Sequence, residues 1–192
     1  MLSQVSTKAA VVYQTRIMAK ELPKESLPNS FHLVAEILDQ SGRRIDERKQ
    51  KINLSRTGKV VMDNLWVSQP SLWSPSHSNL YKLQLKLYYS DLLLDQQTLP
   101  IGIRYTRFSA DSGFFLNGQN LKIKGVCNHH DLGALGAAVH KDALERRLQI
   151  LKAMGCNAIR TAHNSPSPEL LDLADSLGFL ILNEAFDEWI YG

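Results

Sequence analysis

The stretch from Cys156 to Asn183, "CNAIRTAHNSPSPELLDLADSLGFLILN", places a longer amphipathic segment between two short apolar ones. The short segments "CNAIR" and "FLILN" are typical of strands covered on both faces. The middle segment predicts a helix, because Ser167 is a good N-cap, Pro168 suits the first helical position, and Gly178 can adopt the left-handed conformation that ends a helix. Strand, helix and strand in succession indicate a right-handed βαβ unit with parallel strands.

The same pattern occurs once more, immediately before this stretch. Residues 121–126, "LKIKGV", predict a strand, and residues 142–155, "DALERRLQILKAMG", predict a helix. Asp142 and Glu145 have the spacing of a capping box, and Gly155 supplies a left-handed stop. The second half of the chain is therefore expected to form a βαβαβ run with a parallel sheet.

The first half of the chain, from Lys8 to about Phe108, consists of short runs in which apolar and polar residues alternate. In "YKLQLKLYY", residues 81–89, Leu83, Leu85 and Leu87 alternate with Gln84 and Lys86, which is typical of a half-buried strand. Two further predicted strands are "KINLS", residues 51–55, and "LPIGIRYTRF", residues 99–108. Turn-forming residues separate these runs, so we expect an antiparallel sandwich of about seven strands and of immunoglobulin-like size.

Composition excludes several classes of protein. With 44% apolar residues, 21% charged residues and a formal net charge of +3, the chain is typical of a globular protein. No apolar run approaches the roughly 20 residues of a membrane span. Basic and acidic residues are interleaved, which argues against a nucleic-acid partner. No signal peptide is visible at the N-terminus.

Two further expectations follow from spacing and length. Cys127 follows one predicted strand and Cys156 precedes the next, which places them at opposite ends of a parallel sheet, so two free and buried thiols are expected. The parallel sheet has only three predicted strands, whereas a doubly wound domain or a closed barrel needs more, and an eight-stranded barrel takes about 250 residues. We therefore expect the chain to be part of a longer protein.

Two segments carry a resemblance to a known family. They are "FLNGQNLKIKGVCNHHD", residues 115–131, and "NAIRTAHNSPSPELLDLADSLGFLILNEAFDEW", residues 157–189. Both resemble glycoside hydrolase family 2, which includes β-galactosidases and β-glucuronidases. The form "HHDLGALGAAV" is closer to the bacterial β-galactosidase branch. The resemblance implies an immunoglobulin-like β-sandwich over residues 1–108 and the first part of a catalytic TIM barrel over residues 109–192.

The resemblance also implies an activity. Such a protein is a retaining, exo-acting β-glycosidase, with β-galactosidase as the expected activity and β-glucuronidase or β-mannosidase as alternatives. In the family the acid/base Glu follows Asn at the end of the fourth barrel strand, and the nucleophile ends the seventh. Asn183 and Glu184 end only the third strand, where the family usually has Asp-Glu-Ala. Both catalytic glutamates are therefore expected beyond Gly192, and the chain by itself is expected to be inactive.

Candidate sugar-binding residues lie at the predicted ends of the first two barrel strands. The resemblance implies that His129 contacts the sugar, that Arg160 holds a catalytic carboxylate in its ionised form, and that His163 and Asn164 lie beside the sugar hydroxyls. A lone arginine can equally form a surface ion pair, and a lone histidine can be a hydrogen-bonded filler. Because these residues share the carboxyl end of consecutive parallel strands, we favour the pocket.

Asp131 has two interpretations. It contacts a sugar hydroxyl, or it caps the loop "DLGALGAA" that follows. His129 and His130 are neighbours on an extended segment, so their side chains are expected to point in opposite directions. That geometry argues against a metal-dependent barrel hydrolase that uses His129, His130, Asp131 and His163, because such sites usually separate the first two ligands by one residue.

No cofactor is expected. In the branch of the family that binds magnesium, the resemblance implies a ligand at the position of Glu188 and a His two residues later, where this chain has Ile190. The expected partner is an oligosaccharide or glycoside substrate, with a homo-oligomer as a further expectation and with both periplasm and cytoplasm open as locations. A non-enzymatic alternative is a carbohydrate-binding or spacer sandwich, in which Trp66 and Trp73 would stack on sugar, although Trp73 is expected to pack against the sandwich core.

Overall fold

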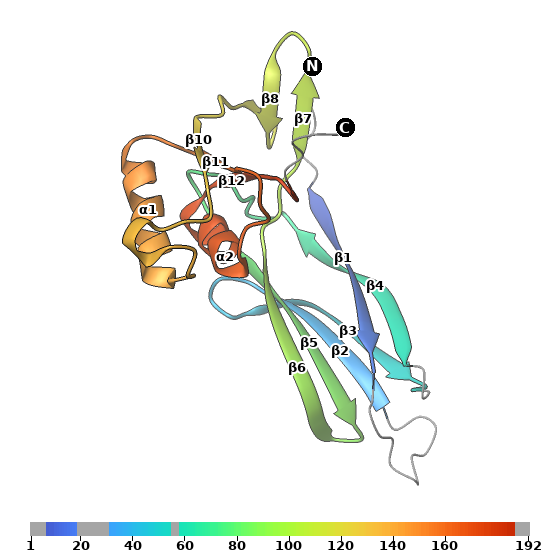
Figure 1. Ribbon diagram of the computed structural model, residues 1–192. Helices are drawn as coiled ribbons and strands as arrows, with labels where there is room; N and C mark the ends of the chain where they lie inside the picture. The colour runs from blue at the N-terminus through green and yellow to red at the C-terminus, as the bar shows by residue number, and fades with distance from the viewer. Residues whose placement is uncertain (1–6, 19–30, 55–57, 187–192) are drawn as a thin grey trace. The chain divides into compact units, whose positions relative to one another are not determined.

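The computed structural model describes residues 7–18, 31–54 and 58–186 (Figure 1). The chain divides into two compact units. One comprises residues 6–71 and 80–103, and the other comprises residues 1–5, 72–79 and 104–192. They are called the sandwich unit and the barrel unit below, and each is described by itself.

The sandwich unit contains two antiparallel sheets. The strands are β1 (Lys8–Ile17), β2 (Phe31–Leu38), β3 (Arg44–Ile52), β4 (Lys59–Ser68), β5 (Tyr81–Tyr89) and β6 (Leu92–Ile101). Strands β1 and β4 form one sheet, and the other has the order β3-β2-β5-β6. The immunoglobulin-like sandwich is thereby confirmed. Six strands belong to this unit in the described part of the chain, against about seven expected.

The core of the sandwich unit comes from the alternating residues of its strands. Leu83 and Leu85 on β5 are buried, as the alternation predicts. They pack with buried residues of the other strands into one cluster, which includes Leu33 and Ile37 on β2 and Leu65 on β4. The opposite face of β5 carries Lys82, Gln84 and Lys86, so a period of two explains both this strand and its part of the core.

Two strand boundaries in the sandwich unit differ from the sequence prediction. Strand β3 covers residues 44–52, not 51–55, and β6 covers residues 92–101, not 99–108. Most of β6 is exposed at the edge of its sheet, so no alternation of buried and exposed residues marks it. Pairing with β5 in a tight hairpin determines these bounds, and Ser90 adopts a positive φ of 50° in the turn.

The barrel unit contains the predicted parallel sheet. Strands β10 (Gly125–Asn128), β11 (Ala158–Thr161) and β12 (Leu180–Asn183) are parallel neighbours in chain order. Helix α1 (Lys141–Ala153) connects the first two, and α2 (Pro168–Leu177) connects the last two. The first three strands and two helices expected of a barrel are confirmed, although β10 covers residues 125–128 and not the predicted 121–126. Figure 1 shows both helices beside this sheet.

One face of the parallel sheet packs against the helices. Ile159 on β11 is buried in one cluster with Leu148 of α1 and Leu173 of α2. Cys127, Arg160 and Leu182 lie opposite one another in the register of the three strands and alternate with that buried row, so they belong to the other face. Leu182 on this second face is 64% exposed.

The barrel unit also has a small antiparallel sheet that the sequence analysis did not separate. It consists of β7 (Thr106–Ser109), β8 (Gly113–Leu116) and β9 (Gln119–Asn120). A short 3-10 helix, η1 (Gly133–Leu135), lies in the loop between β10 and α1. Both β8 and β9 are too short for a periodic signal.

The predicted ends of α2 are correct. The Ser167 side chain accepts a hydrogen bond from the backbone N–H of Leu170, Pro168 begins the helix, and Gly178 is left-handed with φ 77°. The capping box predicted for α1 is wrong. His140 occupies the N-cap without a side-chain hydrogen bond, and Asp142 lies within the first turn of the helix.

Two other expectations need correction. Trp73 is fully buried, but its indole N–H donates to the carbonyl of Asp175, 2.7 Å away, so it packs within the barrel unit and not in the sandwich core. Both cysteines are free as expected, yet Cys127 is exposed and Cys156 is half-buried. Cys127 lies in β10, on the sheet face that the helices leave uncovered.

In the described residues, neither helix combines the length and hydropathy that a membrane span requires.

Candidate functional site

The carboxyl ends of the three parallel strands bring the candidate residues together. Asn128, Thr161 and Asn183 end β10, β11 and β12 and stand in register with one another. His129 and Glu184 therefore follow two of these strands at the same edge of the sheet. Barrel active sites form at this edge, so the sheet puts the predicted residues where a pocket is expected.

Arg160 contacts residues of both neighbouring strands. It lies on the sheet face opposite the buried Ile159. Its Nη1 donates to the Sγ of Cys127 on β10 at 3.6 Å, and its Nε donates to Oε1 of Glu184 after β12. The guanidinium thus contacts β10 on one side and the residue after β12 on the other, and these two contacts fix its position.

Glu184 accepts hydrogen bonds on both carboxylate oxygens. Oε1 accepts from Arg160, and Oε2 accepts from the backbone N–H of His163 at 2.6 Å. The ring Nδ1 of His163 lies 3.4 Å from the same Oε2. The backbone N–H of Glu184 in turn donates to the hydroxyl of Thr161 at 3.2 Å. The carboxylate is therefore held from two directions, and its own backbone is tied to the neighbouring strand.

These contacts favour the ionised form of Glu184. The backbone N–H of His163 lowers the pKa of the carboxyl group most, the Arg160 guanidinium lowers it further, and desolvation opposes them only in part. A general acid needs the opposite shift, because it must still carry its proton near neutral pH. The environment of Glu184 therefore favours a carboxylate anion near neutral pH and not a proton donor.

The rings of His163 and His129, which follow β11 and β10, lie against each other. Their ring centroids are 5.5 Å apart in an edge-to-face arrangement. His163 has a φ of 68°, which is a left-handed conformation that a residue with a side chain rarely adopts. Such conformations concentrate at functional sites, where surrounding contacts hold them in place.

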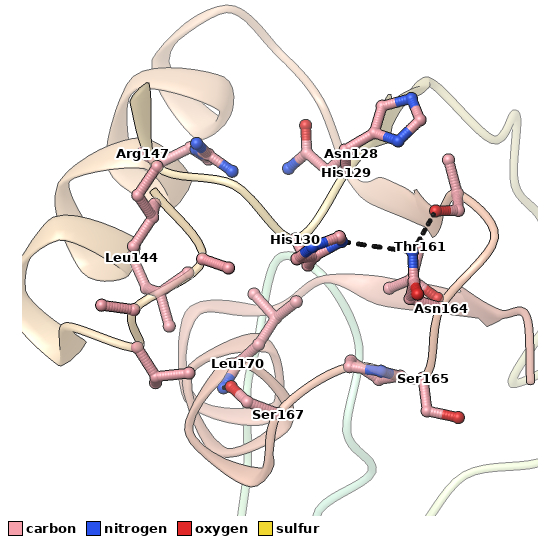
Figure 2. A pocket seen from close by; sticks show the side chains of 16 residues that line it. Asn128, His129, His130, Leu144, Arg147, Thr161, Asn164, Ser165, Ser167 and Leu170 are labelled. Carbon is pink, nitrogen blue, oxygen red and sulfur yellow. Dashed lines mark hydrogen bonds between the residues drawn. The ribbon is translucent and has the colours of Figure 1, made fainter. Parts of the chain in front are cut away.

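A cavity of about 340 Å³ lies in the barrel unit beside this cluster (Figure 2). Its wall includes polar residues after β10 and β11 and apolar residues of both helices, among them Leu144 and Leu170. His130 and Asn164 line it and are linked by a hydrogen bond of 3.2 Å between Nδ1 and Nδ2. Because the Asn164 amide donates, His130 Nδ1 is the acceptor in this bond.

The structure thus divides the predicted residues into groups. His129, His163 and Arg160 are linked through ring contacts and Glu184. Asn164 is bonded to His130 and to the carbonyl of Ala162. The two adjacent histidines have different ring partners, but both line the cavity, so the expectation that they would not share one pocket is wrong.

Asp131 is held through its main-chain carbonyl. Its carbonyl accepts a hydrogen bond from Nη2 of Arg147 on α1 at 2.5 Å. The short helix η1 has Leu132 at its N-cap and no side-chain cap hydrogen bond, and both interpretations of Asp131 stay predictions. The described residues contain no group of three or more His, Cys, Asp or Glu side chains that could hold a metal ion. The residues considered for magnesium, Glu188 and Ile190, lie outside the described residues.

Sequence reasoning missed the partners of Arg160. It identified Glu184 as an imitation of the catalytic motif and assigned it no role, and it treated Cys127 only as a thiol. A signal was available, because parallel pairing in register puts Cys127 and Leu182 directly beside Arg160, and Glu184 two residues after Leu182. The sequence does not specify that register, which is established by the pairing of the three strands in the structure.

Both halves of the chain are similar to known proteins. The family model "Glycosyl hydrolases family 2" matches residues 4–104, and "Glycosyl hydrolases family 2, TIM barrel domain" matches residues 109–189. A β-galactosidase of Bacteroides ovatus, BoGH2A, is 46% identical over 189 residues, which is 97% of this chain and 22% of that protein. A β-glucuronidase of Bacteroides fragilis is 32% identical over 136 residues, covering 69% of this chain and 20% of that protein.

Solved structures give the same result. A glycosyl hydrolase family 2 member from Bacteroides cellulosilyticus has a TM-score of 0.87 and 38% identity, and the match covers 98% of this chain and 24% of that one. The chain spans about a fifth of the length of these relatives. Both halves of the chain match in order and nearly end to end, so the chain belongs to glycosyl hydrolase family 2.

Proposed function

We propose that this chain forms part of a retaining, exo-acting β-glycosidase that removes terminal β-linked galactose. Family membership supports a glycosidase, and a β-galactosidase at 46% identity supports the sugar. The observation that carries the proposal is the cluster of Arg160, His163 and His129 at the carboxyl edge of the parallel strands. The expected ligand is an oligosaccharide or a simple glycoside, and a homo-oligomer is the further partner proposed.

Retention of configuration requires two carboxylates about 5 to 5.5 Å apart, one that protonates the leaving oxygen and one that attacks the anomeric carbon. We place both beyond Gly192. Arg160 would hold one of them, because a guanidinium has five N–H donors and the contacts to Glu184 and Cys127 use only two. His129 and His163 would bond to the sugar hydroxyls.

Two activities of the same family remain as alternatives. A β-glucuronidase at 32% identity supports the first, and β-mannosidase is the second. A glucuronide carries a carboxylate where galactose carries a hydroxymethyl group, so a glucuronidase needs a cation or several N–H donors at that position. Substrate preference therefore separates these alternatives directly.

The test is hydrolysis by a polypeptide that contains this chain and the rest of the barrel. Aryl β-D-galactoside, β-D-glucuronide and β-D-mannoside are compared at equal concentration. We expect the galactoside to have the highest kcat/KM. A preference for the glucuronide or the mannoside would replace the proposed sugar, and the absence of hydrolysis of all three would reject the glycosidase. The 192-residue chain alone should hydrolyse none of them.

Arg160→Ala tests the role of the arginine in the same polypeptide. Turnover should fall on every aryl galactoside by about 100-fold, because the variant loosens a charged group that every substrate uses. Arg146→Ala removes the same charge from an exposed position on α1 and is the matched control, for which we expect unchanged turnover. Equal activity of the two variants would exclude Arg160 from the site.

The non-enzymatic alternative rests on the sandwich unit. Trp66 is 38% exposed, and the ammonium of Lys8 lies 4.4 Å from its ring centroid. Aromatic faces at this exposure can stack on sugar rings. Glycan binding by the 192-residue chain that is lost in Trp66→Ala would favour a carbohydrate-binding module. Binding that survives this substitution would not.

A further inference from the structure

We infer that Glu184 is a positioning residue, whose carboxylate holds the Arg160 guanidinium and the left-handed turn at His163 in the geometry that the sugar pocket needs. This inference rests on the proposed function. It gives a role to a residue whose sequence context only imitates the catalytic Asn-Glu pair.

The first observation is the division of the carboxylate between two partners. Oε1 accepts from the side chain of Arg160, and Oε2 accepts from the backbone of His163. Arg160 precedes the end of β11, and His163 follows it. Glu184 therefore fixes the residues on both sides of the point where the strand becomes the active-site loop.

The second observation is the conformation of His163. A left-handed backbone is unfavourable for a residue with a Cβ atom, and it persists where surrounding contacts determine it. The bond of 2.6 Å from the His163 N–H to the Glu184 carboxylate is such a contact. A charged acceptor makes this bond stronger than a neutral one would be.

The third observation is the anchoring of Glu184 itself. Its backbone N–H donates to the hydroxyl of Thr161, and Thr161 is only 5% exposed. The residue before it, Asn183, pairs with Thr161 in the parallel register. Because the backbone of Glu184 is hydrogen-bonded to the packed sheet, its carboxylate can hold Arg160 and His163 in place.

These contacts determine what each substitution removes. In Glu184→Gln the amide oxygen can accept from one of the two partners, while the amide nitrogen can accept from neither. One of the two residues is then released, and the negative charge beside Arg160 is lost. In Glu184→Asp the charge stays but the side chain is shorter by one methylene group.

The kinetic experiment uses the polypeptide that completes the barrel and a series of aryl β-galactosides with leaving groups of increasing acidity. We expect Glu184→Gln to lower kcat and raise KM, with a loss in kcat/KM of about tenfold or more that is equal across the series. Azide should not restore activity, and Glu184→Asp should recover part of the loss. Glu169→Gln, an exposed acid on α2, is the matched control and should behave as the wild type.

Three kinetic outcomes would overturn the inference. Sparing of activated leaving groups, or rescue by azide, would make Glu184 the acid/base catalyst. Unchanged kinetics in Glu184→Gln would show that the contacts have no functional role. A loss that appears only with unfolding, measured as a thermal transition below the assay temperature, would make the role merely structural.

A second readout does not depend on activity. In the 192-residue chain the amide proton resonance of His163 should move upfield at acid pH, when its carboxylate acceptor becomes protonated, and Glu184→Gln should abolish this titration. A His163 amide without titration in the wild type would overturn the inference. If the longer polypeptide hydrolyses no glycoside, the proposed function fails, and this resonance still decides whether Glu184 holds His163.

Discussion

The indole N–H of Trp73 donates to the main-chain carbonyl of Asp175, 102 residues later in the chain. Asp175 lies in the last turn of α2, where carbonyl groups lack a partner within the helix. The carbonyl of Trp73 also accepts from the side-chain amide of Asn117 at 2.9 Å. Residues 72–79 are therefore part of the barrel unit, although they lie between two strands of the sandwich in the sequence.

Two substitutions of Trp73 should destabilise the chain to different extents. Trp73→Phe loses the bond to Asp175 and should lower the free energy of unfolding by about 1 to 3 kcal/mol, because a carbonyl is left without its partner. Trp73→Ala should cost about 3 to 5 kcal/mol through the cavity it leaves. Urea unfolding measures both. Trp66→Phe, at an exposed position, is the control, and an equal loss there would contradict the assignment.

Gly178 should not tolerate a side chain. It is left-handed, and a Cβ atom would lie 2.4 Å from the carbonyl oxygen of Pro75. Gly155 is also left-handed, with φ 87°, but has no atom within 4 Å of that position. Gly155→Ala should therefore cost about 1 kcal/mol for the backbone conformation alone, and Gly178→Ala about 3 kcal/mol. Equal midpoints of thermal unfolding for the two variants would show that Pro75 moves away freely.

The ionised carboxylate of Glu36 should stabilise the sandwich unit at neutral pH. It is 7% exposed and pairs with Lys86 at 2.6 Å and with Arg44 at 3.1 Å. Burial by itself raises the pKa of this carboxyl group, but the hydrogen bonds from Lys86 and Arg44 outweigh it, so the pKa is lowered from 4.5. The unfolded chain then takes up a proton at a higher pH than the folded one, and stability is lost as the pH falls through the folded pKa.

Glu36→Gln tests this linkage. At pH 7 the variant should be less stable by about 2 kcal/mol, because two cations lose their buried counter-charge. The difference should shrink as the pH falls below the ordinary value of 4.5 and the wild type becomes protonated. Glu47→Gln, which removes a more exposed partner of Arg44, should cost less than about 1 kcal/mol. A difference that does not change between pH 7 and pH 3 would contradict the role of charge.

The uncovered face of the parallel sheet should make the 192-residue chain self-associate. Leu182 is 64% exposed on that face, and in the described residues β10 and β12 each pair with one strand only. Exposed apolar surface beside open strand edges favours association. Light scattering should show oligomers, and Leu182→Lys should reduce them, whereas Ile150→Lys on α1 should have a smaller effect. A compact wild-type monomer would contradict this prediction.

The sequence alone determined the elements whose signal is local. The period of two in residues 81–89 predicted a half-buried strand, and Ser167, Pro168 and Gly178 predicted both ends of α2. These signals depend on residues a few positions apart, so they can be read before the chain folds. The order of the elements was enough to predict a sandwich followed by a parallel βαβαβ run, and the resemblance to glycoside hydrolase family 2 identified that run as the start of a barrel.

Only the tertiary structure decided which residues meet. Nothing local to Trp73 shows that its partner is a helix end 102 residues later. Glu184 reaches Arg160 because β11 and β12 pair in one register, and a shift of one residue would turn Arg160 toward the buried face of the sheet. The sequence could place Arg160, His163 and Glu184 at strand ends. Strand pairing and packing determined that the carboxylate of Glu184 would hold both Arg160 and His163.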